Sequence, residues 1–187
     1  MSRSNVFHLT LEDRLKSLEV GLFPSGSSPL TPDQERWASK VDPVRPEWIR
    51  RLGISRVSAV YAYPLLETAR RVVDKCTSPD SEGQKMVGIS IDVDPERAVV
   101  CDSWTLGEAY SGKDYWRTAV TLDAFRRYFN VSHTEHGLLC EVNEAGRGNT
   151  SVAAYLQPEV LLPGVIDPSR LVVSFVSTHP IKPTIKW

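Results

Sequence analysis

The sequence predicts an α+β fold in a single domain over residues 1–187. Segments with the alternating pattern of strands are interspersed with segments of helical period, but the two do not follow one another as regular βαβ units. With 41% hydrophobic and 24% charged residues, the chain has the composition of a globular domain that buries a core. It contains no glycine-rich phosphate loop of the Rossmann or P-loop type, so a nucleotide would need another kind of site.

The N-terminal part begins with a strand. Residues 5–10 alternate between the two faces of a strand, and residues 11–21 then change to helical period, with three leucines at i, i+4 and i+7 and a glycine at the end. After a loop rich in Ser and Pro, two short helices are expected over residues 33–41 and 45–53.

The middle of the chain continues to mix the two patterns. β-branched and aromatic residues predict a strand over residues 55–63, and apolar residues at helical spacing predict a helix over residues 65–76. The other elements expected here are two strands within residues 85–102 around an Asp-Pro turn, short helices over 105–112 and 121–129, and a strand over 136–142.

The C-terminal part contains a charge that needs an explanation. A Gly- and Asn-rich loop over residues 143–151 is followed by strands over 154–164 and 170–178, and Glu159 lies within the first of these strands. A carboxylate at a half-buried strand position is unfavourable by several kcal/mol unless it is paired. Glu159 is therefore a solvated strand end, the partner of an arginine such as Arg170, or a charge kept for chemistry.

The charge balance and the cysteine content narrow the class of protein and the compartment that fit this chain. Lys plus Arg number 22 and Asp plus Glu number 23, a balance that argues against a nucleic-acid coat protein or a membrane-surface protein but leaves room for a local basic groove. Cys76, Cys101 and Cys140 are irregularly spaced, as expected of reduced thiols. The N-terminus lacks the apolar segment of a signal peptide, and no run is long enough to span a membrane. A cytoplasmic protein without membrane contact is expected.

Three stretches form an ordered set of motifs. In "FHLTLEDRLKSLEVGL" a strand carries His8, Leu9 and Thr10, and the following segment ends in a Gly-Leu pair at Gly21. In "AVYAYPLLETA" a strand carries Tyr61 and is followed by a helix with a small residue. In "QPEVLLPGVIDPSRLVV" a strand opens with a Glu before a hydrophobic run.

Together these stretches resemble the ADP-ribosyltransferase superfamily, in its His–Tyr–Glu branch. That branch includes poly-ADP-ribose polymerases, tRNA 2′-phosphotransferases and the DNA-modifying toxins of toxin–antitoxin pairs. The sequence His-Leu-Thr is more similar to that of the toxins than to the His-Gly-Thr of the other two groups. The resemblance covers nearly the whole chain and implies a split, mixed β-sheet core with flanking helices.

The resemblance also implies a reaction and assigns residues to it. NAD would be the co-substrate, with no metal, and the bond between nicotinamide and ribose would be cleaved. Glu159 would stabilise the positive charge that grows on the ribose. His8 would donate a hydrogen bond to the adenosine ribose, and Tyr61 would stack on the cationic nicotinamide. The remaining residues implied in NAD binding are Leu9, Thr10, Gly21 and Tyr63, and which of Tyr61 and Tyr63 stacks stays open, although Tyr61 fits the motif spacing better.

The loop before Glu159 is implied in choosing the acceptor. Arg147 would contact an anionic target, and Gln157 lies two residues before the Glu, as in enzymes that modify side chains or nucleobases. The expected function is mono-ADP-ribosylation of a nucleic-acid or protein acceptor, and the toxin resemblance leaves room for an antitoxin partner. The alternatives are an NAD glycohydrolase, an RNA 2′-phosphotransferase, or an inactive module that binds a nucleotide or a partner.

Other constellations are weaker. His133, His136 and Cys140 have the spacing of metal ligands but lack a fourth ligand. Asp92 and Asp94 lie in a turn that lacks the glycine and the final Glu of a calcium loop. The basic clusters "RPEWIRR" and "ETARRVVDK" have the composition either of a nucleic-acid or pyrophosphate face or of solvated helix faces.

Overall fold

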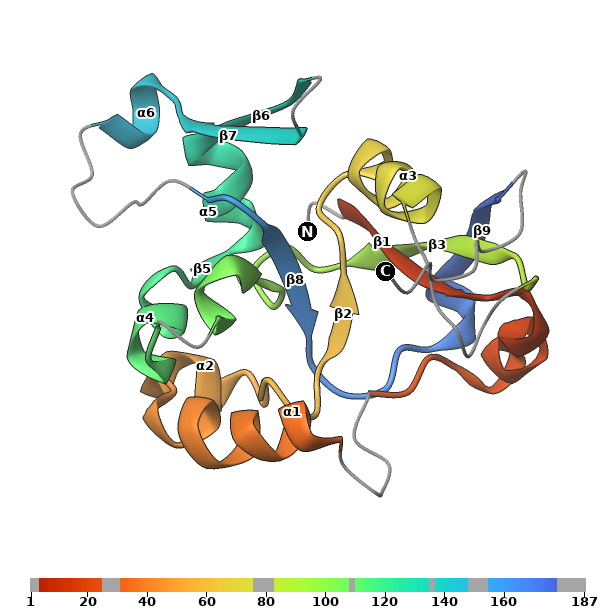
Figure 1. Ribbon diagram of the computed structural model, residues 1–187, viewed down its shortest axis with the longest axis horizontal. Helices are drawn as coiled ribbons and strands as arrows, with labels where there is room; N and C mark the ends of the chain where they lie inside the picture. The colour runs from red at the N-terminus through yellow and green to blue at the C-terminus, as the bar shows by residue number, and fades with distance from the viewer. Residues whose placement is uncertain are drawn as a thin grey trace, which may run out of the picture.

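The computed structural model describes residues 4–24, 31–75, 83–107, 110–134, 137–147 and 155–177. These residues form several small sheets with short helices around them, so the expectation of an α+β protein is confirmed (Figure 1). Every strand pair in these ranges is antiparallel, so the expected mixture of parallel and antiparallel strands is wrong. The chain reverses direction between neighbouring strands, and none of these pairs requires the long crossover of a parallel pair.

The described strands belong to three sheets, with strand orders β1-β3-β9, β2-β8-β4-β5 and β6-β7. Their bounds are β1 Ser4–Leu11, β2 Val60–Ala62, β3 Met86–Val93, β4 Val99–Asp102, β5 Val120–Thr121, β6 Phe129–Thr134, β7 Gly137–Val142, β8 Pro158–Leu162 and β9 Leu171–Val176.

The described helices are short and lie mostly on the periphery (Figure 1). The α-helices are α1 Pro32–Arg36, α2 Glu47–Arg51, α3 Leu66–Lys75, α4 Gly112–Arg117, α5 Leu122–Tyr128 and α6 Glu144–Arg147. The 3₁₀ helices are η1 Glu12–Val20, η3 Asp42–Val44, η5 Ser103–Leu106 and η6 Pro168–Arg170, and the π-helical segment is η2 Trp37–Val41. No described helix is long and apolar enough to cross a membrane.

The first two sheets are joined edge to edge by one bridge. Phe7 of β1 pairs with Tyr63, and the N–H of each donates to the carbonyl of the other at 2.9 and 2.7 Å. Because β2 pairs with β8 on its other edge, the strands β1, β2 and β8 are successive neighbours. The three motif stretches of the sequence are therefore side by side in the fold, as Figure 1 shows for β2 and β8.

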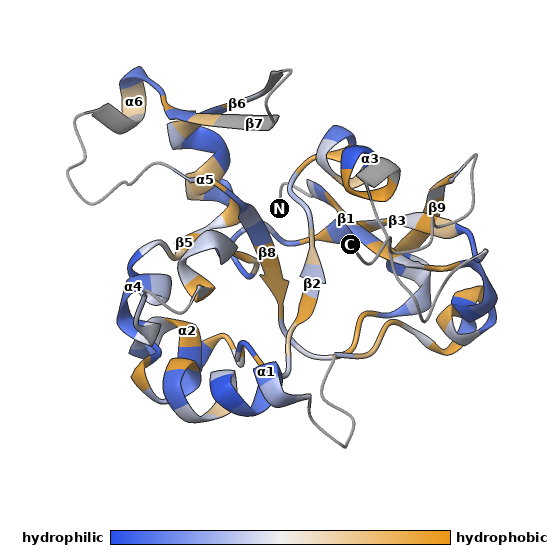
Figure 2. Cartoon of the chain, in the orientation of Figure 1, coloured by the Kyte–Doolittle hydropathy of each residue, from blue (hydrophilic) through white to orange (hydrophobic). Residues whose placement is uncertain are grey.

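The four-stranded sheet has a hydrophobic cluster on each face. Alternation along β8 sends Val160 and Leu162 into one cluster and Leu161 into the other. Figure 2 shows β8 changing from hydrophilic at its start to hydrophobic at its end, whereas the outer helices carry many hydrophilic residues. The cluster on the Leu161 side packs against α2, η2 and α4, and its buried members are Val41, Ile49, Ile54, Ala59, Val99, Cys101, Tyr115, Trp116 and Leu161.

The helix expected over residues 11–21 is a 3₁₀ helix. It begins after Leu11, which provides no side-chain cap, and it buries none of its residues fully. Leu15 and Leu18 pack partly against the core. These two leucines are three residues apart, the spacing that aligns side chains in a 3₁₀ helix, so a tighter helix satisfies the same apolar contacts.

Two elements near the site also differ from their expected bounds. The strand expected over residues 55–63 is reduced to β2, because the chain turns at residues 56–58. A helix was expected over residues 105–112, but the structure has η5, which ends at Leu106, and α4, which begins only at Gly112. The start of α4 is set by a capping box, in which Ser111 accepts from the Asp114 N–H and Asp114 accepts from the Ser111 N–H.

The strand expected over residues 136–142 is confirmed as β7, and it forms a hairpin with β6, a strand that was not expected. Residue 136 lies outside the described residues, as do residues 148–151 of the loop expected over 143–151, whose first part forms α6. This hairpin lies away from β2 and β8 and does not position the candidate site (Figure 1).

Candidate functional site

Glu159 lies on β8, between β2 and β4. It is opposite Cys101 of β4, and it shares a strand face with Leu161, on the side of the sheet covered by α2 and α4. Its side chain is only 13% exposed. Glu159 is therefore not a solvated strand end, and its carboxylate needs a partner within the protein.

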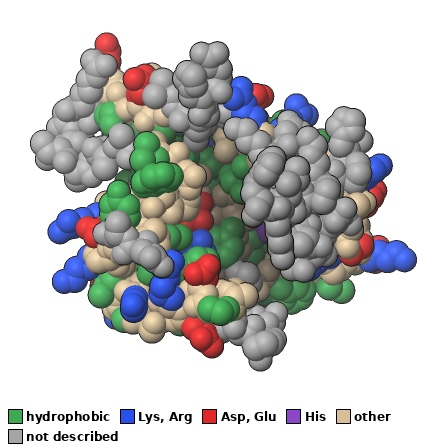
Figure 3. All heavy atoms as spheres, in the orientation of Figure 1, with side chains coloured by type: hydrophobic (Ala, Val, Ile, Leu, Met, Phe, Trp, Pro, Cys, Tyr) green, Lys and Arg blue, Asp and Glu red, His purple; other side chains and the backbone are tan. Residues whose placement is uncertain are grey.

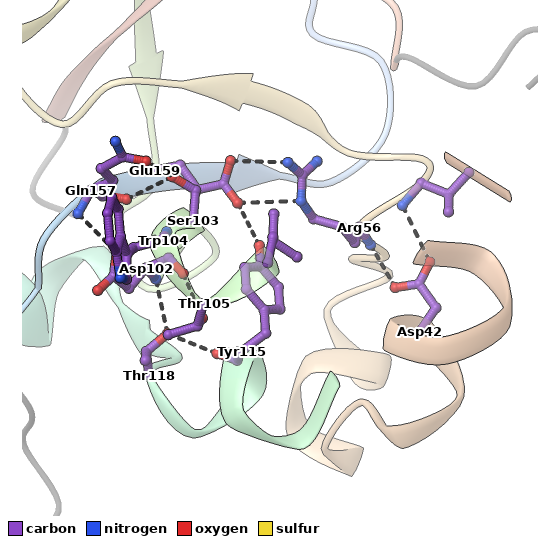
Figure 4. Close-up of polar contacts among 12 residues, drawn as sticks. Asp42, Arg56, Asp102, Ser103, Trp104, Thr105, Tyr115, Thr118, Gln157 and Glu159 are labelled. Carbon is purple, nitrogen blue, oxygen red and sulfur yellow. Dashed lines mark hydrogen bonds and ion pairs between the residues drawn. The ribbon is translucent and has the colours of Figure 1, made fainter. Parts of the chain in front are cut away.

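The partner is Arg56 (Figure 4). Arg56 Nε lies 3.3 Å from Glu159 Oε1, and Arg56 Nη2 donates to Oε2 at 3.3 Å. The arginine side chain is 7% exposed. The ion-pair explanation is confirmed, but the expected partner Arg170 is wrong, because Arg170 donates its Nε to the Asp92 carbonyl at 2.7 Å.

The backbone around Arg56 is fixed by Asp42. Oδ1 of Asp42 accepts from the Arg56 N–H at 2.7 Å, and Oδ2 accepts from the Val57 N–H at 3.2 Å. Asp42 directly follows the π-helical segment η2. One carboxylate thus joins η3 to the turn before β2, and from this turn the Arg56 side chain extends toward β8 (Figure 4).

Two aromatic rings hold the guanidinium of Arg56. Its central carbon lies 4.1 Å from the centre of the Trp37 ring and 4.0 Å from the centre of the Tyr61 ring. A cation–π contact of this kind contributes about 0.5–2 kcal/mol, with the upper end at desolvated sites. We call Trp37 and Tyr61 the aromatic clamp. Tyr61, expected to stack on a cationic ring, already stacks on a planar cation of the protein itself.

Tyr115 of α4 is the second partner of the carboxylate. Its hydroxyl donates to Glu159 Oε1 at 2.7 Å, and its side chain is fully buried. The helix approaches η2 closely at Gly112, where a Cβ would lie 2.3 Å from the Lys40 carbonyl oxygen. Any other residue there would push α4 outward, so this glycine helps to keep Tyr115 within reach of β8.

Burial has the largest effect on the pKa of the Glu159 carboxylate. It raises the pKa of Glu159, and the Arg56 charge and the Tyr115 hydrogen bond offset part of that rise. Burial alone would lower the pKa of Arg56, but Glu159, Tyr115 and Tyr61 together more than compensate, so the pKa is raised and the arginine stays charged. Burial also raises the pKa values of Tyr115 and Cys101 well above their ordinary values, so both remain protonated as neutral groups.

His8 joins the site through the backbone of Tyr61. Its Nδ1 lies 2.7 Å from the Tyr61 carbonyl oxygen, which can only accept, so Nδ1 carries the proton and Nε2 is left as an acceptor. Burial lowers the pKa of His8, and the hydrogen bond to Tyr61 offsets this only in part. A neutral His8 can accept a hydrogen bond from a hydroxyl through Nε2, the reverse of the donor role implied for it by the resemblance.

The depressed pKa of His8 predicts a stability that depends on pH. In the unfolded chain the His8 imidazole has a pKa near 6.5. The contribution of His8 to the free energy of unfolding is therefore fully present above that pH and is lost as the pH falls from 6.5 through the folded-state pKa. We expect the free energy of unfolding to fall by up to about 1.4 kcal/mol per pH unit in that window. His8→Gln is expected to flatten this fall, measured by urea unfolding on both sides of pH 6.5. Equal slopes in the two proteins would contradict the assignment to His8.

The other residues implied in NAD binding lie farther along the same elements. Leu9 and Thr10 are half-buried in β1, opposite Gly88 and Val87 of β3. Gly21 ends η1 with a φ of 114°, and a Cβ there would meet the Ile166 carbonyl oxygen at 2.8 Å, so this position requires glycine.

Tyr63 forms the bridge to Phe7 at the junction of the two sheets. Of the two tyrosines, Tyr61 is the one with a described contact between its ring and the Arg56 guanidinium. The described contacts therefore link His8 to Tyr61 through the Tyr61 carbonyl, and Tyr61 to Glu159 through Arg56.

Gln157 lies at the entrance to β8 and is exposed. Its N–H donates to Asp102 Oδ1 at 2.8 Å, and its carbonyl accepts from the N–H of Ser103 at 2.9 Å. The backbone two residues before Glu159 is thus firmly anchored, while the Gln157 side chain extends from it (Figure 4). The other residue expected to contact an acceptor, Arg147, ends α6, and its side chain lies outside what the structure describes.

A groove of about 410 Å³ adjoins the aromatic clamp and shares Trp37 with it. It runs between η2, η5 and the start of α4, and the residues that line it are Arg36, Trp37, Lys40, Val41, Thr105, Leu106, Gly107, Tyr110, Ser111 and Gly112. Figure 3 shows Lys and Arg side chains interspersed with Asp and Glu on this side of the molecule. The groove combines two cations with aromatic walls, a combination that suits an anionic, planar ligand.

The two groups of possible metal ligands noted in the sequence do not form a metal site in the described part of the chain. No group of three or more His, Cys, Asp or Glu there is arranged to hold a metal ion. Cys140 is buried, whereas His136 and the side chain of His133 lie outside the described residues. Asp94 instead stabilises its own turn by accepting from the Glu96 N–H at 3.1 Å.

Three residues of the site were not found from the sequence, namely Trp37, Arg56 and Tyr115. Arg56 falls in the segment expected to be a strand, where its side chain had no assigned partner. Tyr115 lies in α4, and the Ser111-x-x-Asp114 capping box in the sequence would have predicted where this helix begins. No local pattern indicates that these side chains converge on Glu159, because the contacts join segments far apart in the chain.

Comparisons with family models, curated proteins and solved structures found no match to this chain. The geometry of the site is therefore what supports a function.

Proposed function

We propose that the protein is an NAD-dependent mono-ADP-ribosyltransferase with an ADP-ribosyltransferase-like fold, acting on a nucleic-acid or protein acceptor. The observation that carries the proposal is the convergence of the three motif strands around a buried carboxylate. Glu159 is held by Tyr115 and contacts the same guanidinium, that of Arg56, as the Tyr61 ring, and the Tyr61 carbonyl is hydrogen-bonded to His8.

The residues present fit the cationic end of NAD. The Tyr61 ring and the Glu159 carboxylate already accommodate a planar cation, the Arg56 guanidinium. The nicotinamide ring of NAD is also planar and carries one positive charge, so stacking on Tyr61 and attraction to Glu159 suit both groups. His8, neutral and with Nε2 as acceptor, provides a partner for a ribose hydroxyl.

In the reaction the bond between ribose C1′ and the nicotinamide nitrogen breaks, and its electron pair leaves with neutral nicotinamide. Positive charge grows on the ribose, and a carboxylate in a site that excludes water stabilises this charge more than it stabilises the bound substrate. An N–H or O–H group of the acceptor then forms the new bond to C1′ and loses its proton. The basic groove beside the clamp is the surface that we assign to the acceptor.

A second candidate is supported by one observation. Arg56 neutralises Glu159 and covers the Tyr61 ring, as expected of an inactive module that binds a nucleotide without turnover. NAD binding without nicotinamide release would favour this candidate.

The test is an assay of nicotinamide release from NAD by the purified protein. Parallel reactions contain no acceptor, single-stranded DNA, RNA or total cell protein, and the acceptor is checked for covalent ADP-ribose by mass spectrometry. Release that requires one acceptor class establishes transfer and identifies that class. Release without an acceptor indicates a glycohydrolase, and the absence of both release and NAD binding rejects the proposal.

Tyr115→Phe is expected to slow nicotinamide release about tenfold, the effect of losing one hydrogen bond to a charged group. The hydroxyl lowers the pKa of Glu159, so its removal raises that pKa and moves the acid side of the pH–rate profile to higher pH. The matched control is Tyr155→Phe, because Tyr155 also has a buried hydroxyl but donates it to the Thr118 carbonyl. An unchanged pH profile in Tyr115→Phe would show that the tyrosine acts only through packing.

A further inference from the structure

Arg56 is buried but poorly hydrogen-bonded. Nη2 donates to Glu159 at 3.3 Å, a long hydrogen bond, and Nε lies 3.3 Å from the other carboxylate oxygen as an ion pair. Neither Nε nor Nη1 makes a hydrogen bond among the described residues. Arg50 shows the contrast, since it donates Nε and Nη2 to the carbonyls of Arg45 and Pro43 at 3.0 and 2.8 Å. A guanidinium held mainly by stacking and charge can be exchanged for another planar cation with little loss of hydrogen bonding.

We propose that Trp37, Tyr61 and Glu159 form a binding site for a planar cation and that Arg56 is its internal ligand. The two rings of the aromatic clamp, each about 4 Å from the Arg56 guanidinium carbon, select a flat group. The carboxylate selects a positive charge, because burial leaves it with few other partners. The ligand class is therefore a flat monocation such as a guanidinium or a pyridinium, in preference to a tetrahedral ammonium.

The walls of the site are held independently of the Arg56 side chain. Tyr61 is paired with Leu161 across β2 and β8, and Glu159 keeps its hydrogen bond from Tyr115. Trp37 opens the π-helical segment η2, a local geometry that often marks functional sites.

Asp42 binds the backbone N–H of Arg56 and not its side chain. The turn therefore remains in place in variants of Arg56, and the arginine side chain can leave the clamp without dismantling the site.

One consequence rests on the proposed function. If NAD enters this site, its nicotinamide ring and Arg56 compete for the same clamp, and the apparent affinity for NAD is reduced by the fraction of time for which Arg56 fills it. Release of Arg56 would at the same time free Glu159 from its ion pair. The arginine would then act as an internal gate on the carboxylate.

The experiment removes the internal ligand and offers an external one. In Arg56→Ala, low millimolar guanidinium chloride is titrated while the melting temperature and the tryptophan fluorescence are recorded. We expect a saturable rise in melting temperature of about 2–4 °C, which wild type does not show because its site is filled. Sodium chloride at equal ionic strength and tetramethylammonium chloride are expected to give no saturable effect. Absence of a saturable guanidinium effect in folded Arg56→Ala overturns the proposal.

Two further variants make the outcome specific. Arg56→Met retains an apolar side chain of similar length and replaces Arg56→Ala if the latter does not fold, with the same expected response. Adding Trp37→Leu to either variant removes one wall of the clamp and is expected to abolish the guanidinium effect. If the effect survives the loss of Trp37, guanidinium binds elsewhere and the proposal is wrong.

A last arm uses NAD itself, measured by calorimetry. Arg56→Ala is expected to bind NAD about tenfold more tightly than wild type, which corresponds to an internal ligand present about nine-tenths of the time. Weaker binding in Arg56→Ala would show that Arg56 contacts NAD favourably and is not a gate. If neither protein binds NAD, the proposed function fails, and the guanidinium titration still decides whether the planar-cation site exists.

Discussion

Glu159→Gln is expected to lower the rate of nicotinamide release at saturating NAD at least a hundredfold, a much larger loss than the loss of affinity for NAD. Removing one preorganised group that stabilises transition-state charge typically reduces turnover by about 10²–10³. Glutamine has nearly the same shape, and its amide oxygen can still accept from the Tyr115 hydroxyl. The variant therefore removes the charge and keeps the Tyr115 contact, while its NH2 group can no longer accept from Arg56. Initial rates at saturating NAD, together with calorimetric NAD binding, separate the two effects.

The pH dependence makes this prediction sharper. Burial raises the pKa of Glu159 above its ordinary value of 4.5, so the active, ionised form is lost as the pH falls through a value higher than 4.5. Wild type should show this acid limb, and the residual activity of Glu159→Gln should not. Removal of Arg56 should move the limb of the otherwise intact protein to still higher pH, because the arginine lowers the pKa of the carboxylate.

The matched control is Glu141→Gln, because Glu141 is an exposed carboxylate on β7, in the hairpin that lies away from β2 and β8 (Figure 1). It is expected to retain the wild-type rate and pH profile. A Glu159→Gln protein that is folded, binds NAD and turns it over at the wild-type rate would return Glu159 to a purely structural ion pair with Arg56.

Local patterns were sufficient to predict the strands that carry the site. The hydrophobic run after Glu159 places this residue at the start of a buried strand, and β-branched and aromatic residues place Tyr61 on another. Period-2 alternation also predicts that Glu159 and Leu161 share a face. These features depend on residues close in sequence, and the structure confirms the strands.

The pairing of side chains was not predictable in the same way. The contact of Arg56 with Glu159 spans 103 residues and that of Tyr115 with Glu159 spans 44, and each depends on how a helix or a turn docks on the sheet. Arg170 was the nearer arginine in sequence, but the register of β9 with β3 takes it to Asp92. Sequence proximity is a poor guide here, because a strand buries its charge against whatever segment covers that face.

Asp102 is the second residue whose loss should have a large effect. It ends β4, is 3% exposed, and accepts hydrogen bonds from the backbone N–H groups of Trp104, Leu156 and Gln157 at 3.2, 3.0 and 2.8 Å. The last two donors belong to the segment that leads into β8. The carboxylate thus ties the entry of the strand that carries Glu159 to the start of η5 (Figure 4).

Asp102→Ala is expected to lower the free energy of unfolding by about 3 kcal/mol, since it leaves three backbone donors beside a buried position without their charged acceptor. Urea unfolding measures this loss. The matched control is Asp167→Ala, because Asp167 makes the same kind of contact at η6, accepting from the Ser169 N–H at 2.8 Å, but on the exposed surface. Water replaces that acceptor, so a much smaller loss is expected there. Equal losses in the two variants would show that the segment before β8 finds other partners. A large loss in Asp102→Ala alone would show that the buried Asp102 carboxylate stabilises the segment that leads into the strand of Glu159.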